Sequence, residues 1–408
     1  MEHVEALECT VCGERYEPSG IQYTCPRHDD PLVGVFDVIY DYDVVLDRFD
    51  AAIDGNIPNM WKYRPFLPIE TDADPITLNE GGTELFDTPQ LSEELGVHVR
   101  VKDDSRNPTA SFKDRASSVS VTKAKHHDHE IVICASTGNA AASLAGYAAR
   151  GGLDCRIFVP ESAPAGKLAQ PLVYGADVLQ VQGSYAQAFE LSMAATAQYG
   201  WYNRNAGYNP YQVEGKRTSG FEIAEQTRNA PADWVVVSVG DGCTIAGIWK
   251  GLREFAELGY IDDPPNVLGV QAEGASLIHD VFHGDVDPEE VADTLADSIA
   301  VAKPANLHKA VNAMKQSGGD CVTVSDQAIL DGEVLLGSSE GLYGEPAAAA
   351  TVAGAQRAIE DGIIDRNDSV VLLSSGYGLK DTENARRAAG DPYRIDPDLS
   401  EVERIYGA

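Results

Sequence analysis

Basic residues are scarce in this sequence. Lysine and arginine total 31 against 64 aspartates and glutamates, which gives a formal net charge of -33 at pH 7. Such a chain repels the phosphates of a nucleic-acid backbone, so the composition argues against a nucleic-acid partner. The acidic residues are spread along the chain rather than gathered in a tail. Because salt screens repulsion between charges, this composition favours a salt-adapted source, with an ordinary acidic protein as the alternative.

Long apolar runs are also missing. No stretch reaches the roughly 18 apolar residues that a membrane helix needs, so no membrane span is predicted. Residues 1–9 are acidic and contain no apolar signal core. Cysteine occurs seven times, and this odd count fits a reducing compartment better than a disulfide framework. These absences predict a cytoplasmic protein.

What is present is a chain of 408 residues, 43% of them hydrophobic, which is long enough for more than one domain. Runs of valine, isoleucine and leucine predict buried strands at 130–135, 155–160, 178–182, 234–239, 267–272, 321–324 and 369–373. Alanine-rich stretches between them predict helices at 139–150, 185–199, 245–258 and 346–361. This alternation predicts an α/β fold in which helices cover parallel sheets.

One nonapeptide combines a turn, a lysine and a helix start: Asn107-Pro-Thr-Ala-Ser-Phe-Lys-Asp-Arg115. A strand is predicted before it at 98–102, and a helix after it at 116–125. A lysine that is partly buried at such a position loses its proton more easily. The neutral amine of Lys113 could then condense with an aldehyde. The alternative is a solvated surface lysine between charged neighbours.

Three predicted strands end in polar loops. Ser136-Thr-Gly-Asn139 offers hydroxyls and helix-start N–H groups to a carboxylate, although an ordinary helix cap has the same composition. Gly240-Asp-Gly-Cys-Thr244 allows the backbone to close on a phosphate at a helix start. Ser375 follows the last strand, at the edge where parallel sheets bind ligands. With Lys113, these loops suit a small phosphorylated aldehyde and an amino-acid substrate, and pyridoxal phosphate fits this description.

The N-terminal segment contains two ligand pairs, Cys9-Thr-Val-Cys12 and Cys25-Pro-Arg-His28. Two residues separate the members of each pair, a spacing that suits tetrahedral zinc held by three thiolates and one imidazole. With all four positions filled by protein, such a site would be structural rather than catalytic. The alternative is a ribbon-like extension without a metal.

Together these motifs resemble the threonine synthase family, within the tryptophan-synthase-β-like, fold-type-II class of pyridoxal-phosphate enzymes. The resemblance lies in the cysteine-rich ribbon and in residues 107–115, 136–141, 209–216, 240–244, 345–347 and 378–381. It implies two parallel-sheet α/β domains with the cofactor in the cleft between them, preceded by a zinc-ribbon-like segment. The expected divisions are a ribbon at 1–35, an arm and the start of the large domain at 36–97, a smaller domain at 98–205 and the large domain at 206–408.

The resemblance also implies a role for individual residues. Lys113 would form the Schiff base and then move protons, and the neighbouring Phe112 would contact the cofactor. Asn139 would bond the ring hydroxyl, and Ser375 would meet the pyridine nitrogen. The cofactor phosphate would be held by Gly240, Asp241, Gly242, Cys243 and Thr244. The substrate carboxylate would be held by Ser136, Thr137 and Asn139.

The implied reaction converts O-phospho-L-homoserine and water to L-threonine and phosphate, in a family that is commonly homodimeric. Several positions depart from the family pattern, and two of them concern the substrate phosphate: Ala206 and Gln212 stand where many relatives have a serine and an arginine that help bind it. Gln212 cannot offer a fork of charged donors. Arg204, Lys216 and Arg217 are nearby cations that could compensate.

Two other interpretations stay open. One is a paralogous lyase or β-replacement enzyme acting on another amino acid, such as a serine/threonine dehydratase, a cysteate synthase or a diaminopropionate enzyme. The other is a catalytically silent, metabolite-binding relative. Retention of Lys113, Asn139 and the glycine loop argues against the silent relative.

Overall fold

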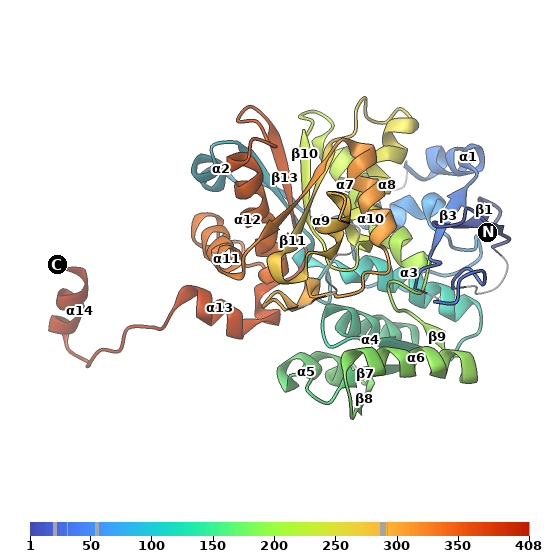
Figure 1. The fold of residues 1–408 in the computed structure, drawn as a ribbon, viewed down its shortest axis with the longest axis horizontal. Coiled ribbons are helices and arrows are strands. Elements are labelled where there is room, and N and C mark those ends of the chain that lie inside the picture. The colour runs from blue at the N-terminus through green and yellow to red at the C-terminus, as the bar shows by residue number, and fades with distance from the viewer. Residues whose placement is uncertain (19–22, 31, 54–56, 286–290, 292, 408) are drawn as a thin grey trace.

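The computed structural model describes residues 1–18, 23–30, 32–53, 57–285, 291 and 293–407. Its strands form three sheets, one in an N-terminal segment, one in a smaller domain and one in a larger domain. In Figure 1 the smaller domain lies below the larger one, and the N-terminal segment packs at the side of the larger domain near α8 and α10.

The larger domain is built on a six-stranded sheet in the order β12-β11-β10-β13-β5-β4. All neighbours are parallel except β4 and β5. The strands are β4 (Leu85–Asp87), β5 (His98–Asp103), β10 (Trp234–Ser238), β11 (Asn266–Ala272), β12 (Asp320–Val324) and β13 (Ser369–Ser374). Every residue of β10 is buried, as expected for a parallel strand covered on both faces.

Helices cover both faces of this sheet. Trp234 and Val236 pack with α11 and α12 on one face, whereas Val235 and Val237 pack with α8 and α10 on the other. The helices of this domain are α2 (Pro89–Leu95), α7 (Tyr211–Thr227), α8 (Cys243–Glu257), α9 (Leu277–Phe282), α10 (Leu307–Ser317), α11 (Asp326–Glu340), α12 (Pro346–Glu360) and α13 (Thr382–Ala389). Successive residues of β10 thus face opposite sides of the sheet, because side chains along a strand alternate with a period of two.

The smaller domain has a parallel sheet in the order β8-β7-β6-β9. Its strands are β6 (Ile131–Ala135), β7 (Asp154–Pro160), β8 (Asp177–Val181) and β9 (Tyr202–Asn203), and its helices are α4 (Asn139–Gly151), α5 (Ala165–Val173) and α6 (Tyr185–Tyr199). Helix α3 (Lys113–His126) packs against α4 of this domain and α7 of the larger one. This helix therefore connects the two domains, and Lys113 is its first residue.

The N-terminal segment is a three-stranded antiparallel sheet of β1 (Val4–Cys9), β2 (Arg15–Tyr16) and β3 (Phe36–Tyr40), followed by α1 (Tyr42–Ile53). Because β3 pairs with β1, this sheet continues past residue 35, where the ribbon was expected to end. Its apolar side joins the core that also contains residues of α8 and α10.

The α/β class with parallel sheets is confirmed, and each predicted strand lies within a residue or two of an observed one. One division differs. The smaller domain was expected to begin at residue 98, but β5 pairs with β13 along its whole length and lies in the larger sheet. Only long-range pairing decides which sheet a strand joins, and the sequence near residue 98 contains no signal for it.

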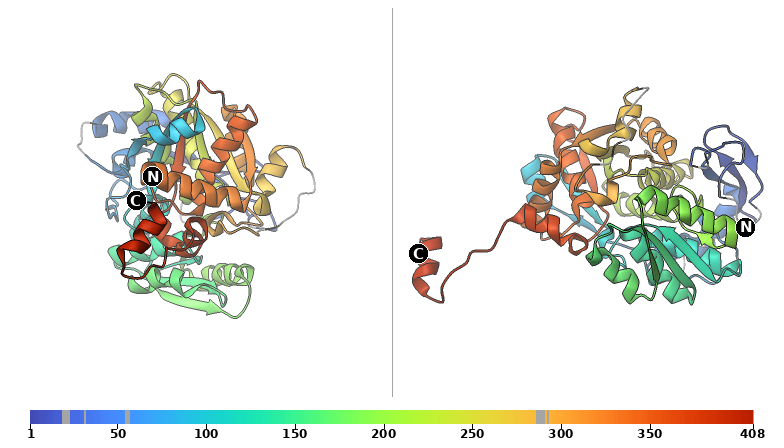
Figure 2. Two further views of the ribbon diagram at one scale, coloured as in Figure 1. Left: turned by 90° about the vertical axis from the view of Figure 1, so that its left-hand side faces the viewer. Right: turned by 60° about the horizontal axis from the view of Figure 1, so that its bottom comes forward.

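Helix α7 was not predicted. It buries charged residues as well as apolar ones along almost its whole length, so its sequence shows no amphipathic stripe. No helix in the described part of the chain has both the length and the apolar character needed to cross a membrane. After α13 the chain runs out from the body and ends in α14 (Leu399–Tyr406), none of whose residues is buried (Figure 2).

Candidate active site

The turn that precedes Lys113 is held by the residue that follows it. The Asp114 carboxylate accepts hydrogen bonds from the backbone N–H of Thr109 (2.6 Å) and from the hydroxyls of Thr109 and Ser143 (2.6 Å for Ser143). Ala110 has a φ of 66°, a backbone conformation that costs free energy for a residue with a side chain. This bonding therefore holds Lys113 in place at the first position of α3.

Three loops meet around Lys113. The N–H of Phe112 donates to the carbonyl of Ser375 (2.9 Å), and the N–H of Tyr377 donates to the carbonyl of Ala110 (3.1 Å). The N–H of Glu345 donates to the carbonyl of Gly376 (2.9 Å). A Cβ at Gly376 would lie 2.4 Å from the Glu345 carboxyl, so a side chain there would displace this carboxylate. The end of β13, the start of α12 and the lysine loop thus form one unit.

The glycine loop joins β10 to α8. Gly242 has a φ of 93°, and a Cβ there would lie 2.7 Å from the carbonyl oxygen of Asn306. The Asp241 carboxylate turns aside and accepts hydrogen bonds from the N–H of Ala305 (3.0 Å) and the amide of Asn306 (2.7 Å). With this charge directed elsewhere, the loop presents the first N–H groups of α8, which suit a phosphate.

The Ser136–Asn139 loop lies where β6 gives way to α4. The Asn139 amide donates to both carboxylate oxygens of Glu345 (2.9 and 2.8 Å), across the boundary between the domains. The Ser136 hydroxyl accepts from the N–H of Gly138 (3.2 Å). Ser136 and Thr137 are half-buried beside Asn139, and within the described chain neither bonds to Lys113 or Glu345.

The electrostatic environment makes Lys113 less basic than a free lysine. Burial lowers the pKa of Lys113 to about 8, and the positive charges of Lys216 and Arg204 act in the same direction. Cys243 and Glu345 oppose this effect. The Lys216 ammonium donates to the Cys243 sulfur, on the glycine loop. A neutral Lys113 amine is therefore accessible at mildly alkaline pH, as nucleophilic attack on an aldehyde requires.

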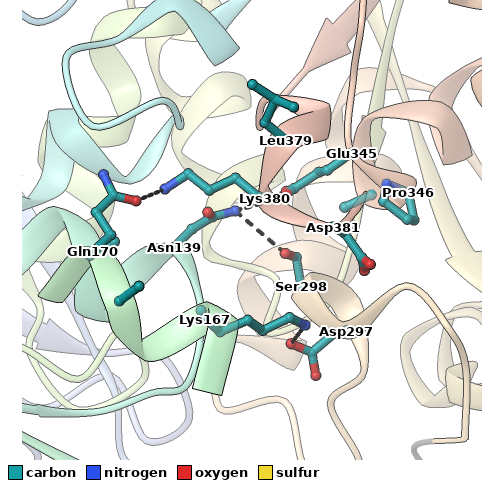
Figure 3. A pocket seen from close by; sticks show the side chains of 15 residues that line it. Asn139, Lys167, Gln170, Asp297, Ser298, Glu345, Pro346, Leu379, Lys380 and Asp381 are labelled. Atoms are coloured by element: carbon teal, nitrogen blue, oxygen red, sulfur yellow. Dashed lines mark hydrogen bonds and ion pairs between the residues drawn. The ribbon is translucent and has the colours of Figure 1, made fainter. Parts of the chain in front are cut away.

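A cavity of about 220 Å³ opens between the two domains (Figure 3). One wall comes from α4 and α5, and the other from residues 297–298, 345–347 and 379–381. Lys167 forms an ion pair with Asp297 (2.6 Å), and the Lys380 ammonium donates to the Gln170 side chain (2.6 Å). Both contacts join the smaller domain to the larger one across the cavity.

Among the predicted residues, Asn139 lines this cavity. Glu345 links it to Lys113, since its carboxylate bonds Asn139 and its charge acts on Lys113. Sequence reasoning did not select Glu345 as a site residue, although Pro346 directly after it is a typical first residue of a helix. Lys216 and Arg204 were considered only as nearby cations, because nothing in the sequence showed that α7 would bring Lys216 to Lys113.

A second cluster lies in the N-terminal segment. The donor atoms of Cys9, Cys12, Cys25 and His28 all lie within 4.8 Å of one another. The Cys12 and Cys25 sulfurs are 3.8 Å apart, and the Cys9 sulfur is 3.4 Å from Nε2 of His28. A tetrahedron with Zn–S bonds of about 2.3 Å has edges of about 3.8 Å, so this arrangement suits zinc.

These features fit pyridoxal phosphate: an amine of lowered pKa, a glycine loop at a helix start, and amide and hydroxyl groups at one edge of the fold. Residues 76–376 also match the family model described as "Pyridoxal-phosphate dependent enzyme". The chain therefore belongs to the pyridoxal-phosphate-dependent enzymes.

Two similar proteins of known name show to which family within this class the chain belongs. The chain is 38% identical over 403 residues to the threonine synthase of Methanocaldococcus jannaschii, covering 97% of this chain and 98% of that one. It is also 38% identical over 407 residues to the threonine synthase of Methanosarcina acetivorans, with 98% of each chain covered. Within the class, the chain belongs to the threonine synthase family.

Solved structures agree on the fold. A threonine deaminase from Solanum lycopersicum superimposes with a TM-score of 0.65 at 20% identity, covering 92% of this chain and 98% of that one. A diaminopropionate ammonia lyase from Escherichia coli superimposes with a TM-score of 0.66 at 18% identity, covering 78% of this chain and 94% of that one. At these identities the likeness shows the fold alone.

Proposed function

We propose that this chain is a threonine synthase, a carbon–oxygen lyase that converts O-phospho-L-homoserine and water to L-threonine and phosphate. The observation that best supports this proposal is Lys113 itself, whose amine has a pKa of about 8 beside the glycine loop and Ser375. The identity of 38% over nearly the whole length of two threonine synthases supports the choice of substrate.

Each residue near Lys113 has a place in this proposal. The N–H groups of residues 240–244 hold the cofactor phosphate, Asn139 bonds the ring hydroxyl, Phe112 packs beside it and Ser375 meets the ring nitrogen. Ser136, Thr137 and Asn139 orient the substrate carboxylate. Bound pyridoxal phosphate supplies an electron sink that stabilises negative charge at the substrate carbons. The Lys113 amine takes the proton from Cα and returns protons later, because a pKa lowered to about 8 lets it both accept and release a proton near neutral pH.

Water has to stay out of the site until the addition step. The Lys167–Asp297 ion pair and the Lys380–Gln170 hydrogen bond each bridge the two walls of the cavity, and in this proposal they hold the domains together around the substrate. Because these contacts lie outside the reacting centre, they position the two domains rather than take part in the chemistry.

For the N-terminal segment we propose a structural zinc ion held by Cys9, Cys12, Cys25 and His28. The four ligands leave no open position for a substrate, so the metal would stabilise the segment only. Removing zinc with a strong chelator should increase proteolysis within residues 1–40. Unchanged proteolysis after chelation would contradict the metal site.

The same proposal includes a cytoplasmic, homodimeric enzyme. All seven cysteines are free thiols, as expected in a reducing compartment. Light scattering would give the oligomeric state, and a monomeric mass would contradict the dimer.

A paralogous lyase acting on another amino acid is the second candidate, and the family departures favour it. Gln212 is fully buried, and its amide donates to the Ser120 hydroxyl on α3. As its uncharged amide predicted, it supplies no charged fork for a substrate phosphate, and the amide is already bonded to Ser120.

One assay separates the two candidates. The purified protein, with pyridoxal phosphate in high KCl, is incubated with O-phospho-L-homoserine while phosphate and threonine are measured together. Equal amounts of both products are expected, and a Lys113→Ala variant provides the blank. Absence of both products, together with spectral changes on adding serine or threonine, would contradict the threonine synthase assignment.

A further inference from the structure

Most deeply buried cations in this protein are neutralised by a carboxylate. Those with at most 1% of their surface exposed are Lys102, Arg115, Lys123, Arg204, Lys216 and Arg217. Four of them form ion pairs: Lys102 with Glu222 (2.7 Å), Arg115 with Asp104 (2.7 Å), Lys123 with Glu70 (3.2 Å) and Arg217 with Glu254 (2.9 Å). Within the described residues, Arg204 and Lys216 have no carboxylate at ion-pair distance.

A buried charge without a partner costs several kcal/mol, so proteins seldom keep one unless a ligand neutralises it. Nη2 of Arg204 lies 3.4 Å from the carbonyl oxygen of Lys113, and Lys216 contacts the glycine loop, so both unpaired charges lie close enough to lower the pKa of Lys113. The two buried cations that lack a carboxylate partner therefore both lie at the candidate active site. This arrangement indicates that anionic ligands bind there.

The two cations serve different parts of the site. Lys216 donates to the sulfur of Cys243, in the loop assigned to the cofactor phosphate. Arg204 follows β9 and approaches Lys113 from the smaller domain, where its N–H bonds the carbonyl of Ile133 (2.8 Å). Lys216 thus belongs with the cofactor phosphate, which leaves Arg204 for a second anion.

The guanidinium of Arg204 has unused donors. Its Nε and Nη2 donate to the Ser117 hydroxyl (3.3 and 3.2 Å), and Nη2 makes a long contact with the carbonyl of Lys113 (3.4 Å). Nη1 has no hydrogen-bond partner among the described residues. The nearby carboxylate of Asp114 is occupied by donors from Thr109 and Ser143. Arg204 can therefore offer charged N–H groups to a phosphate.

The other candidates for this role are occupied. Arg217 is paired with Glu254 and Glu214, and Gln212 turns toward Ser120. Building on the proposed function, we propose that Arg204 binds the phosphate group of O-phospho-L-homoserine, in place of the arginine missing at position 212. When the Cγ–O bond breaks, its electron pair leaves with the phosphate oxygen while the pair left by the Cβ proton forms the Cβ–Cγ double bond, and Arg204 stabilises the charge that increases on the phosphate.

The test uses the holoenzyme and inorganic phosphate, the product of the proposed reaction, as the probe. Arg204→Gln should weaken phosphate binding, measured by calorimetry, and raise the KM for O-phospho-L-homoserine, each by about tenfold or more. Its affinity for pyridoxal phosphate, measured by absorbance titration, should change less than about threefold. Arg204→Lys should recover part of the phosphate affinity. Lys216→Gln should show the reverse pattern and weaken cofactor binding most.

Arg100→Gln serves as a matched control. Arg100, on β5, is also buried, at 5% exposure, and its guanidinium donates to the carbonyl of Ala230, so its contacts do not include Lys113 or the glycine loop. This variant should leave phosphate and cofactor affinity unchanged, which shows that losing a buried arginine does not by itself disturb the site.

The outcomes separate this proposal from the proposed function. Phosphate binding and KM unchanged in both Arg204 variants, or a loss confined to cofactor affinity, would overturn the role of Arg204. Phosphate binding that depends on Arg204 in an enzyme that does not turn over O-phospho-L-homoserine would support the anion site while contradicting threonine synthase activity. A wild-type holoenzyme that binds no phosphate would overturn the site.

Discussion

Lys113 and Arg115 lie two positions apart at the start of α3, yet their surroundings differ completely. Arg115 is fully buried and donates to Asp104 (2.7 Å) and to both oxygens of Glu222 (2.7 Å each), and Lys102 pairs with the same Glu222 (2.7 Å). Lys113 has no carboxylate at ion-pair distance among the described residues, and its charged neighbours include Lys216 and Arg204.

The difference shows how one helix start serves two purposes. Around Arg115, opposite charges satisfy one another, so the network depresses the pKa of Glu222 and joins α3, α7 and β5. Around Lys113, the neighbouring charges of Lys216 and Arg204 are positive like its own and do not neutralise one another. We therefore expect an anionic ligand to neutralise them. The paired charges around Arg115 thus have a structural role, whereas the unpaired cations Arg204 and Lys216 lie beside the candidate active site.

The sharpest test of this contrast is Lys113→Ala. Turnover should fall by about 10^4-fold or more, because both the covalent attachment and the proton transfers lose their amine. The free energy of unfolding should not fall, since Lys113 neutralises no partner. Turnover and thermal unfolding measured on the same preparation check both expectations, and residual turnover near the wild-type rate would contradict the role of Lys113.

The converse change is Glu222→Gln, which leaves Lys102 and Arg115 buried without their shared carboxylate. We expect the free energy of unfolding to fall by about 3–5 kcal/mol. Because the folded-state pKa of Glu222 is depressed, its contribution to stability is present above its unfolded pKa and is lost as pH falls. Urea unfolding at several pH values tests this, and Glu225→Gln, on the exposed side of α7, is the control.

The rate of cofactor loading should follow the protonation of Lys113. Its pKa is lowered from 10.5 to about 8, so the rate of aldehyde attachment to the apoenzyme should rise with pH and level off above about 8. Lys216→Gln removes a like charge, so the midpoint should move to higher pH. Stopped-flow absorbance gives both midpoints, and an unchanged midpoint in the variant would mean that Lys216 does not influence Lys113.

The smallest expected effect concerns an unpaired charge of the opposite sign. Glu333 on α11 is 5% exposed, and among the residues that the structure describes neither of its carboxylate oxygens has a hydrogen-bond partner. Burial raises the pKa of Glu333 to about 7, and the charges of Asp381 and Glu345 add to this. A folded pKa above the unfolded one means that this group costs stability as pH rises from about 4.5 through 7.

Glu333→Gln should therefore stabilise the protein at pH 8 by about 1 kcal/mol, with the difference shrinking toward pH 5. Urea unfolding midpoints at the two pH values provide the measurement. If variant and wild type had equal unfolding midpoints at both pH values, the Glu333 carboxylate would be better solvated than its burial indicates. Glu340→Gln, near the end of the same helix, is a suitable comparison.

Much of the site could be predicted because its residues lie where strands end. Runs of valine, isoleucine and leucine marked β6, β10 and β13, and the polar residues directly after them were predicted to bind the cofactor or the substrate. The hydrogen bond between Phe112 and Ser375 brings the lysine loop to the end of β13 as this argument requires. Local composition suffices for such inferences, because strand propensity and turn chemistry act over a few residues.

The sequence by itself determined the α/β class, the succession of elements and the type of residue offered at each strand end. Only the tertiary structure decided that β5 joins the larger sheet, that Asp241 turns away from the glycine loop, and that Arg204 and Lys216 lie near Lys113 with no carboxylate of the described residues at ion-pair distance from either. These facts depend on contacts between segments distant in the chain. Whether a buried charge is neutralised is a property of all its neighbours, which no local pattern records.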